Sequence, residues 1–145
     1  MKQIIALIVC SLVLWAGEAS AKRLAVGVNR ANVRSGPGTN HEILWSVGKY
    51  YPVDTLKKSG SWWKIRDFES DEGWIHSSLL RKIPSVIVKV PLANLREKPG
   101  TNFRISLQAE KGVSFKRLRQ QGKWLKVQHA DGEVGWIHKS LVWGH

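Results

Sequence analysis

The chain contains two copies of one sequence unit, and the second copy follows the first after a shift of 62 residues. Residues 31–80 and 93–142 share 19 identities in 50 aligned positions. These concentrate in two stretches, where 31–40 corresponds to 93–102 and 73–79 to 135–141. A repeat of this size is typically one small structural unit used twice. We therefore expect two similar domains, and a function that a duplicated small module can perform.

Residues 1–21 have the pattern of a secretory signal peptide. Lys2 provides a positive start, 4–16 is apolar or small, and Ala19-Ser20-Ala21 is a cleavage site of the A-x-A type. The apolar run is shorter than the roughly 20 residues that cross a bilayer. We expect cleavage after Ala21, no transmembrane segment in the mature chain, and export to the periplasm or cell envelope. An uncleaved membrane anchor is the alternative.

The mature chain carries little that could form a catalytic or metal site. Its single cysteine, Cys10, lies in the leader, so neither a disulfide nor a thiol nucleophile is expected after cleavage. No Ser–His–acid grouping and no carboxylate pair is kept in both copies. His76 and His138 recur, but no second ligand recurs beside them. We expect a protein that is not an enzyme and that uses no metal or cofactor.

The positive charge is unevenly distributed. The chain has a net charge of +12, yet 31–80 is balanced with six basic and six acidic residues, whereas 93–142 has ten basic and four acidic. The basic copy is expected to face something anionic. Nucleic acid fits this charge superficially. The predicted export, and the confinement of the charge to one copy, argue against nucleic acid as the partner.

The mature chain has the pattern of a small all-β protein, with no helix expected outside the leader. Short β-branched and aromatic runs alternate with Gly, Pro, Asn and Asp. The strands expected in the first copy are 24–28, 31–35, 43–47, 51–57, 62–67 and 72–76, and those of the second lie 62 residues on. Tight turns are expected at 59–61 and 121–123. The link at 83–88 is short, so the two units are expected to lie close together.

Side-chain alternation assigns the faces of the paired-tryptophan strand. Lys64 will not enter a small core, so Trp62 shares its outer face, while Trp63 and Ile65 point inward. The same reasoning places Ile75 inward and the residues on either side of it outward. The second copy repeats this pattern at 124–128 and 136–138.

The Asn-Val-Arg-Ser-Gly-Pro-Gly-Thr segment at 32–39 and the Gly-Trp-Ile-His-Ser-Ser-Leu-Leu segment at 73–80 resemble the bacterial SH3-like (SH3b) family. The resemblance covers nearly all of the mature chain twice. It implies two consecutive small SH3-like β-barrels, the first at 22–82 and the second at 83–145. Family members are generally thought to bind peptidoglycan peptides or other envelope components, often beside cell-wall hydrolases.

A weaker resemblance to eukaryotic SH3 domains implies where a groove would lie. In those domains the positions that match Trp62, Trp74 and His76 line the peptide groove. The acidic, Tyr-rich start motif of that family is missing here, and His76 stands where a proline is usual. The resemblance therefore implies the location of the groove but not proline-rich ligands.

Three sets of candidate binding residues follow. An outward aromatic constellation occurs in each copy: Trp62, Trp74 and His76, and Trp124, Trp136 and His138. Loop residues Asn40 and Asn102 border the expected groove by analogy. A basic hairpin of the second copy is a candidate anionic contact: Lys116, Arg117, Arg119, Lys123 and Lys126.

Each set also has a structural interpretation. One tryptophan of each pair could cap a barrel end or pack between the domains. The histidines could be hydrogen-bonded structural residues, the loops could serve turn geometry alone, and the lysines and arginines could form a solvated face.

These patterns predict a non-catalytic module of the cell envelope that recognises peptidoglycan or its stem peptides through duplicated aromatic surfaces. Two linked weak sites on one polymer would gain avidity. The alternative is a scaffold that binds an envelope protein such as a cell-wall hydrolase.

Overall fold

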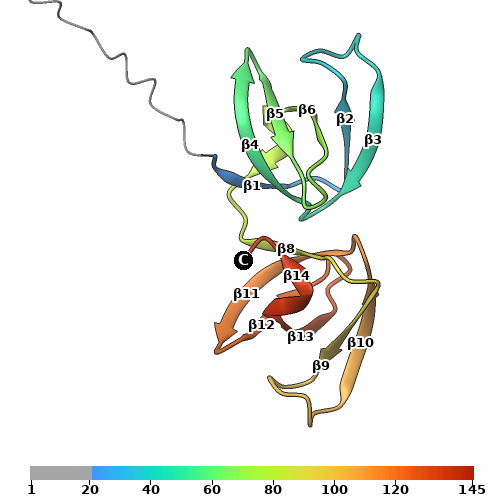
Figure 1. Cartoon of the computed structure of the whole chain (residues 1–145), viewed down its shortest axis with the longest axis vertical. Helices are drawn as coiled ribbons and strands as arrows, with labels where there is room; N and C mark the ends of the chain where they lie inside the picture. The colour runs from blue at the N-terminus through green and yellow to red at the C-terminus, as the bar shows by residue number, and fades with distance from the viewer. Residues whose placement is uncertain (1–20) are drawn as a thin grey trace, which may run out of the picture.

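The computed structural model describes residues 21–145, and the predicted signal peptide lies outside the described residues except for Ala21. Two compact β-units follow one another and stack along the long axis of the molecule (Figure 1). In the described part of the chain, no helix is long and apolar enough to cross a membrane. The two units confirm the predicted all-β fold of two consecutive SH3-like barrels.

The first unit is one antiparallel sheet with the strand order β3-β2-β6-β5-β4-β1-β7. Its strands are β1 (Arg23–Val26), β2 (Arg30–Arg34), β3 (Ile43–Gly48), β4 (Pro52–Ser59), β5 (Trp62–Arg66), β6 (Glu72–His76) and β7 (Leu80–Arg81). The short 3-10 helix η1 (Ser77–Leu79) joins β6 to β7.

The second unit repeats this topology in the order β10-β9-β13-β12-β11-β8-β14. Its strands are β8 (Ser85–Val88), β9 (Leu92–Arg96), β10 (Ile105–Glu110), β11 (Ser114–Gln121), β12 (Trp124–Gln128), β13 (Val134–His138) and β14 (Val142–Trp143). The helix η2 (Lys139–Leu141) precedes β14.

The six expected strands of each unit are present, and the ends differ by a few residues. The expectation of no helix outside the leader is wrong, because η1 and η2 each form a single 3-10 turn. Neither turn has an apolar periodicity, since each is only three residues long and is held by its capping histidine. The short strands β7 and β14 were likewise not predicted, because their two-residue length carries no alternation.

Glycines make the tight geometry possible at two kinds of position. Gly60 and Gly122 lie in the predicted hairpin turns with φ of 57°, a conformation that residues with a side chain rarely adopt. Gly73 allows β6 to pass closely over β2, because a Cβ atom there would lie 2.4 Å from Cγ1 of Val33. The glycine of the Gly-Trp-Ile-His segment therefore serves packing.

Each unit has its own core, formed by the inward-pointing residues of its strands. Ile65 and Ile75 are fully buried in the first, as predicted, and Trp63 packs against this core from its edge. Leu125 and Val127 are fully buried at the corresponding strand of the second.

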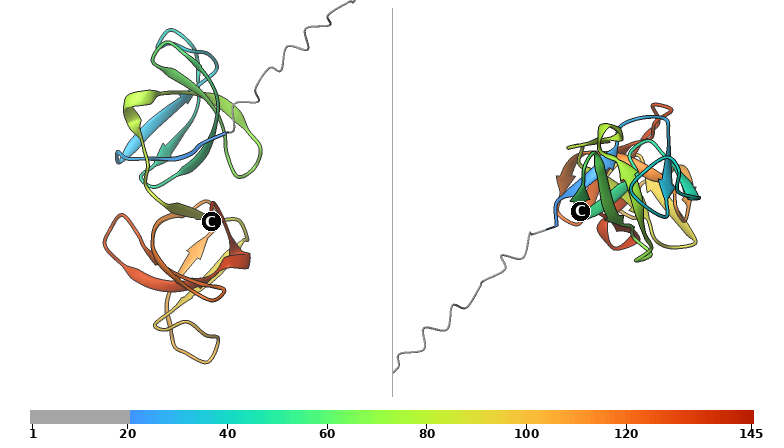
Figure 2. Two further views of the ribbon diagram at one scale, coloured as in Figure 1. Left: turned by 90° about the vertical axis from the view of Figure 1, so that its left-hand side faces the viewer. Right: turned by 90° about the horizontal axis from the view of Figure 1, so that it is seen from above.

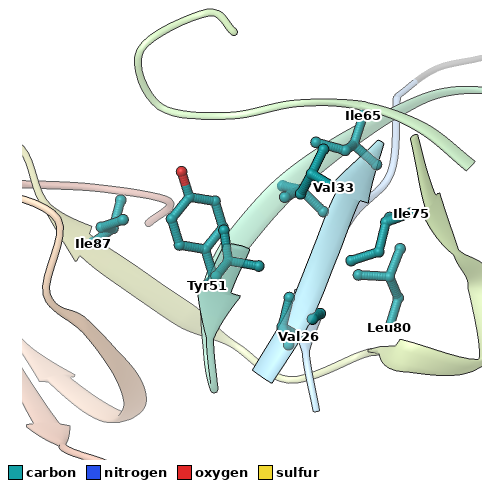
Figure 3. Packing of buried hydrophobic residues seen from close by; sticks show 10 residues of the cluster. Val26, Val33, Tyr51, Ile65, Ile75, Leu80 and Ile87 are labelled. Carbon is teal, nitrogen blue, oxygen red and sulfur yellow. The ribbon is translucent and has the colours of Figure 1, made fainter. Parts of the chain in front are cut away.

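The linking strand β8 contributes to both cores, which makes the two units one packed assembly. All four of its residues are buried. Val86 and Val88 belong to the second core, whereas Ile87 belongs to the first and lies beside Tyr51 (Figure 3). The close approach of the two units expected from the short linker is therefore confirmed.

Further contacts hold the units together around β8. Trp143 of β14 packs against the first core, and the Arg23 guanidinium carbon lies 4.0 Å from the centroid of its ring. The Ser114 hydroxyl donates to the carbonyl oxygen of Lys49 at 3.2 Å. The left view of Figure 2 shows the same stacking of the units along one axis.

Candidate functional site

A tryptophan and a histidine meet face to edge in each unit. Trp62 on β5 is the cross-strand partner of His76 on β6, and their ring centroids are 5.3 Å apart at 86°. Trp124 and His138 repeat the pair at 5.3 Å and 90°. All four side chains are half-buried on the outer side of the sheet. Successive residues of β5 point to opposite sides of the sheet. Ile65 points into the core, so Trp62 lies on the outer side with Lys64.

Each histidine also caps the 3-10 turn that follows it. The Ser78 N–H donates to Nδ1 of His76 at 3.2 Å, and the Ser78 hydroxyl lies 2.7 Å from the same nitrogen. Ser140 makes the same two contacts with His138. A backbone N–H can only donate, so Nδ1 is the acceptor and the neutral ring carries its proton on Nε2. The histidines thus have a structural role and still retain one free donor.

A groove of about 230 Å³ lies beside the first pair. Trp62, His76 and Leu79 line it together with Thr39 and the β2 residues Arg30, Ala31, Asn32 and Arg34. The Arg34 guanidinium donates to the carbonyl oxygens of Thr39 and His41 at 3.1 and 2.9 Å, which ties the 36–41 loop to the groove. The loop therefore borders this groove, through Thr39.

The groove also contains residues that the sequence interpretation missed, namely Arg30, Asn32 and Arg34. Arg30 and Asn32 alternate with the buried Ala31 and Val33, so the period-two pattern of β2 could have placed them on the outer face. Leu79, which matches a groove tyrosine of the eukaryotic SH3 domains, lines the groove from η1.

The surroundings of Trp74 and Trp136 differ from those of Trp62 and Trp124, and they also differ from each other. Trp74 is half-buried and lies under the Lys57 ammonium, 5.7 Å from the ring centroid. It is not among the residues that line the groove at Trp62. Trp136 is only 5% exposed, with the Arg119 guanidinium carbon 5.3 Å from its ring. The expectation of an exposed outward tryptophan at 136 is therefore wrong, because Arg119 covers this ring.

The five cations of the basic hairpin do not share one surface. A bulge between Arg117 and Arg119 shifts the register of β11. Arg117 lines a hollow of about 430 Å³ at the junction of the two units, and Arg119 covers Trp136. Lys126 is the cross-strand partner of Trp136, and Lys116 is that of Gln128. Lys123 lies at the β11–β12 turn, in a separate hollow beside His138.

The loop asparagines are exposed. Asn40 and Asn102 occupy equivalent positions before β3 and β10. In the part of the chain that the structure describes, no group of three or more His, Cys, Asp or Glu side chains is arranged to hold a metal ion.

The tandem barrels and the repeated Trp–His pair together define a duplicated SH3-like module. The family model of the bacterial SH3 domain matches residues 27–82 and again 89–144. The chain belongs to the bacterial SH3 domain family, as its sequence motifs predicted.

Curated relatives carry this module within longer proteins. The chain is 26% identical over 130 residues to the Bacillus subtilis (strain 168) protein named "Putative N-acetylmuramoyl-L-alanine amidase YrvJ", covering 81% of this chain and 24% of that protein. It is 44% identical over 46 residues to "Probable cell wall amidase LytH" of Staphylococcus epidermidis, covering 31% and 16%. The chain thus spans a quarter or less of the length of these relatives.

Among solved structures, the chain is similar to an NlpC/P60 family protein from Bacillus cereus ATCC 10987. It shares 15% identity with a TM-score of 0.41, over 84% of this chain and 56% of that one. NlpC2 from Trichomonas vaginalis shares 15% identity with a TM-score of 0.38, over 86% and 48%.

Proposed function

We propose that the protein is a non-catalytic, exported module of the cell envelope that recognises peptidoglycan or its stem peptides through the groove at Trp62 and His76. The observation that carries this proposal is the groove itself, which is lined by the rings of Trp62 and His76 together with polar side chains of β2. A rigid tryptophan face suits sugar rings and peptide backbone, because it offers a large contact area and one N–H donor.

The charge of the groove suits a ligand with carboxylates. Arg30 and Arg34 both line it, and no acidic side chain does. Arg34 is engaged with two loop carbonyls, whereas Arg30 makes only a 3.5 Å hydrogen bond to the Ser46 hydroxyl, so Arg30 is the side chain best placed to meet a carboxylate of a stem peptide. The names of the curated relatives, which describe cell wall amidases, support the choice of ligand class.

The second unit would contribute through Trp124 and His138, which repeat the aromatic pair. Arg30 of the groove corresponds to Leu92, which is 53% exposed. We therefore propose that the first unit is the main site and that the second adds avidity.

Co-sedimentation with purified insoluble peptidoglycan tests this proposal. Residues 22–145 would be measured at low and high salt, and compared with Trp62→Ala and Arg30→Gln. Trp124→Ala is the matched control, because it removes the same ring from the other unit. We expect salt-tolerant sedimentation of the wild type, a clear loss for Trp62→Ala and a smaller loss for Trp124→Ala. Thermal melts would show that each variant is folded.

Equal binding by wild type and Trp62→Ala would show that this groove is not the site. A steep loss of wild-type binding with salt would instead indicate attraction by exposed charge alone.

The second candidate function, a scaffold for an envelope protein, is favoured by a different observation. Large apolar side chains are exposed on both units, and a polar glycopeptide gives them no partner. They are Ile43, Leu44, Leu92, Phe103, Ile105, Leu118 and Val134. A wild type that does not sediment with peptidoglycan at either salt would leave this candidate as the better one.

A further inference from the structure

A hollow of about 320 Å³ opens on the second unit beside His138, and its lining is basic. Three lysines, Lys89, Lys123 and Lys139, surround it together with His138, Ser140 and His145. No acidic side chain lines the hollow. The three lysines come from three places in the chain: the end of β8, the β11–β12 turn and η2.

Backbone hydrogen bonds bring these lysines together. The N–H of Lys139 donates to the carbonyl oxygen of Lys123 at 2.8 Å. The N–H of Lys89 donates to the carbonyl oxygen of Leu141, at the end of η2, at 3.0 Å. The chain therefore holds three ammonium-bearing residues around one turn, although mutual repulsion of like charges opposes this arrangement.

The first unit shows that the fold itself does not require these lysines. The positions that correspond to Lys89, Lys123 and Lys139 are Gly27, Ser61 and Ser77. The same two hydrogen bonds are present there, from Ser77 to Ser61 at 2.8 Å and from Gly27 to Leu79 at 2.9 Å. The second unit thus adds three positive side chains to an equivalent backbone arrangement.

The added charge has no ion-pair partner among the described residues. Among the ion pairs of residues 21–145, none includes Lys89, Lys123 or Lys139. His145 reports the local potential, because partial burial and then the charges of Lys139 and Lys89 hold its pKa below the usual value. An external anion would relieve this repulsion.

His138 lines the same hollow. Its Nδ1 accepts from the Ser140 N–H, so the neutral ring has its N–H at Nε2. The hollow therefore combines three ammonium groups with one ring N–H. A carboxylate has one charge and two oxygens, whereas a phosphate group carries up to two charges and three or four acceptor oxygens.

We propose that the hollow bounded by Lys89, Lys123, His138 and Lys139 is a binding site for a phosphate group. The ligand class is a phosphate ester or free phosphate, and the site is distinct from the groove at Trp62. The second unit would thereby bind a phosphate group in addition to the contribution of its aromatic pair under the proposed function.

A titration of residues 22–145 with inorganic phosphate at constant ionic strength tests the site. The chemical shifts of the backbone amides are followed by NMR. We expect saturable shifts at Lys89, Lys123, Lys139 and Ser140, and much smaller shifts with acetate. Lys89→Gln/Lys123→Gln/Lys139→Gln should weaken phosphate binding at least tenfold.

The matched control is Lys58→Gln/Lys82→Gln/Lys98→Gln, which removes the same net charge at exposed positions that lie outside the hollow and form no ion pair in the described structure. It should change the phosphate affinity by less than twofold. Equal weakening in both triple variants, or equal shifts with acetate, would overturn the proposal in favour of general charge attraction. The amide spectrum of each variant reports its folding directly.

Vesicles distinguish the sources of the phosphate. A lipid headgroup would be assigned if the protein binds phosphatidylglycerol vesicles but not phosphatidylcholine vesicles. This binding should be lost in the Lys89→Gln/Lys123→Gln/Lys139→Gln variant. Phosphate shifts without vesicle binding would assign a soluble phosphate or ester. Failure of both probes would overturn the site, while leaving peptidoglycan sedimentation through Trp62 unaffected.

Discussion

The phenol of Tyr51 donates a 2.7 Å hydrogen bond to Oδ2 of Asp67, and both side chains are buried in the first unit. The other carboxylate oxygen, Oδ1, accepts from the backbone N–H groups of Glu69 and Asp71 at 3.0 and 2.9 Å. Asp67 therefore organises the β5–β6 turn and connects it to the core beside Ile87. The second unit has no equivalent, because Val113 and His129 occupy these positions.

Tyr51→Phe should destabilise the first unit. The substitution leaves one oxygen of a buried carboxylate without its partner, which costs about 1–3 kcal/mol. Urea unfolding measures the change in the free energy of unfolding. Tyr50→Phe is the matched control, because no hydrogen bond of the Tyr50 hydroxyl occurs in the described structure; its effect should be near zero. Equal effects of the two substitutions would contradict a stabilising role for the Tyr51–Asp67 bond.

The same pair predicts a loss of stability at alkaline pH. Burial, and then the hydrogen bond to Asp67, raise the pKa of Tyr51 well above its usual value. An unfolded tyrosine ionises near pH 10. Above that pH the unfolded state releases a proton that the folded state keeps. The contribution of Tyr51 to the free energy of unfolding is therefore complete below about pH 10 and is lost as the pH rises. The loss approaches about 1.4 kcal/mol per pH unit.

Urea unfolding at pH 9 and pH 11 measures this loss. Tyr51→Phe lacks the titrating group, so its stability should fall less steeply than that of the wild type over this interval. Parallel decreases for the two proteins would show that Tyr51 ionises equally in both states.

Ile87→Ala should weaken the first unit, although Ile87 lies in a strand of the second. Its side chain is fully buried in the first core, and removing such a side chain costs about 2–5 kcal/mol. Amide hydrogen exchange should accelerate in β2 and β5. Val86→Ala is the matched control from the same strand, and should accelerate exchange in β9 and β12 instead. Acceleration confined to the second unit in both variants would disprove this division of β8.

Trp136→Ala should be more destabilising than Trp74→Ala, although the two residues are equivalent in the repeat. The ring of Trp136 is buried, and its removal is expected to cost about 3–5 kcal/mol. Trp74 is half-buried and should cost less. Urea unfolding of both variants measures the difference, and a larger loss for Trp74→Ala would contradict the structure.

Local pattern was sufficient for the longer strands of the fold, although not for η1, η2, β7 and β14. The alternation in 62–66 and 73–76 correctly assigned the inward isoleucines, because a charged lysine cannot enter so small a core. The hairpin glycines were found because a positive φ limits the choice of residue. Repetition of both signals 62 residues apart then predicted two barrels.

The candidate surfaces depended on contacts that local pattern does not contain. Arg119 covers Trp136 because a bulge in β11 changes which residues share a face. The same bulge separates Arg117 from Arg119 and so divides the predicted basic hairpin. A one-residue irregularity of this kind leaves no clear periodic signal.

By itself, the sequence determined the duplicated all-β architecture, the inward face of the main strands and the Trp–His pair of each unit, since these follow from residue spacing along one strand or across one hairpin. Only the tertiary structure decided that Ile87 packs in the first core and that Lys89, Lys123 and Lys139 surround one hollow. Such juxtapositions depend on how distant strands close into a barrel and how two barrels dock, and the spacing of residues along the chain does not encode those distances.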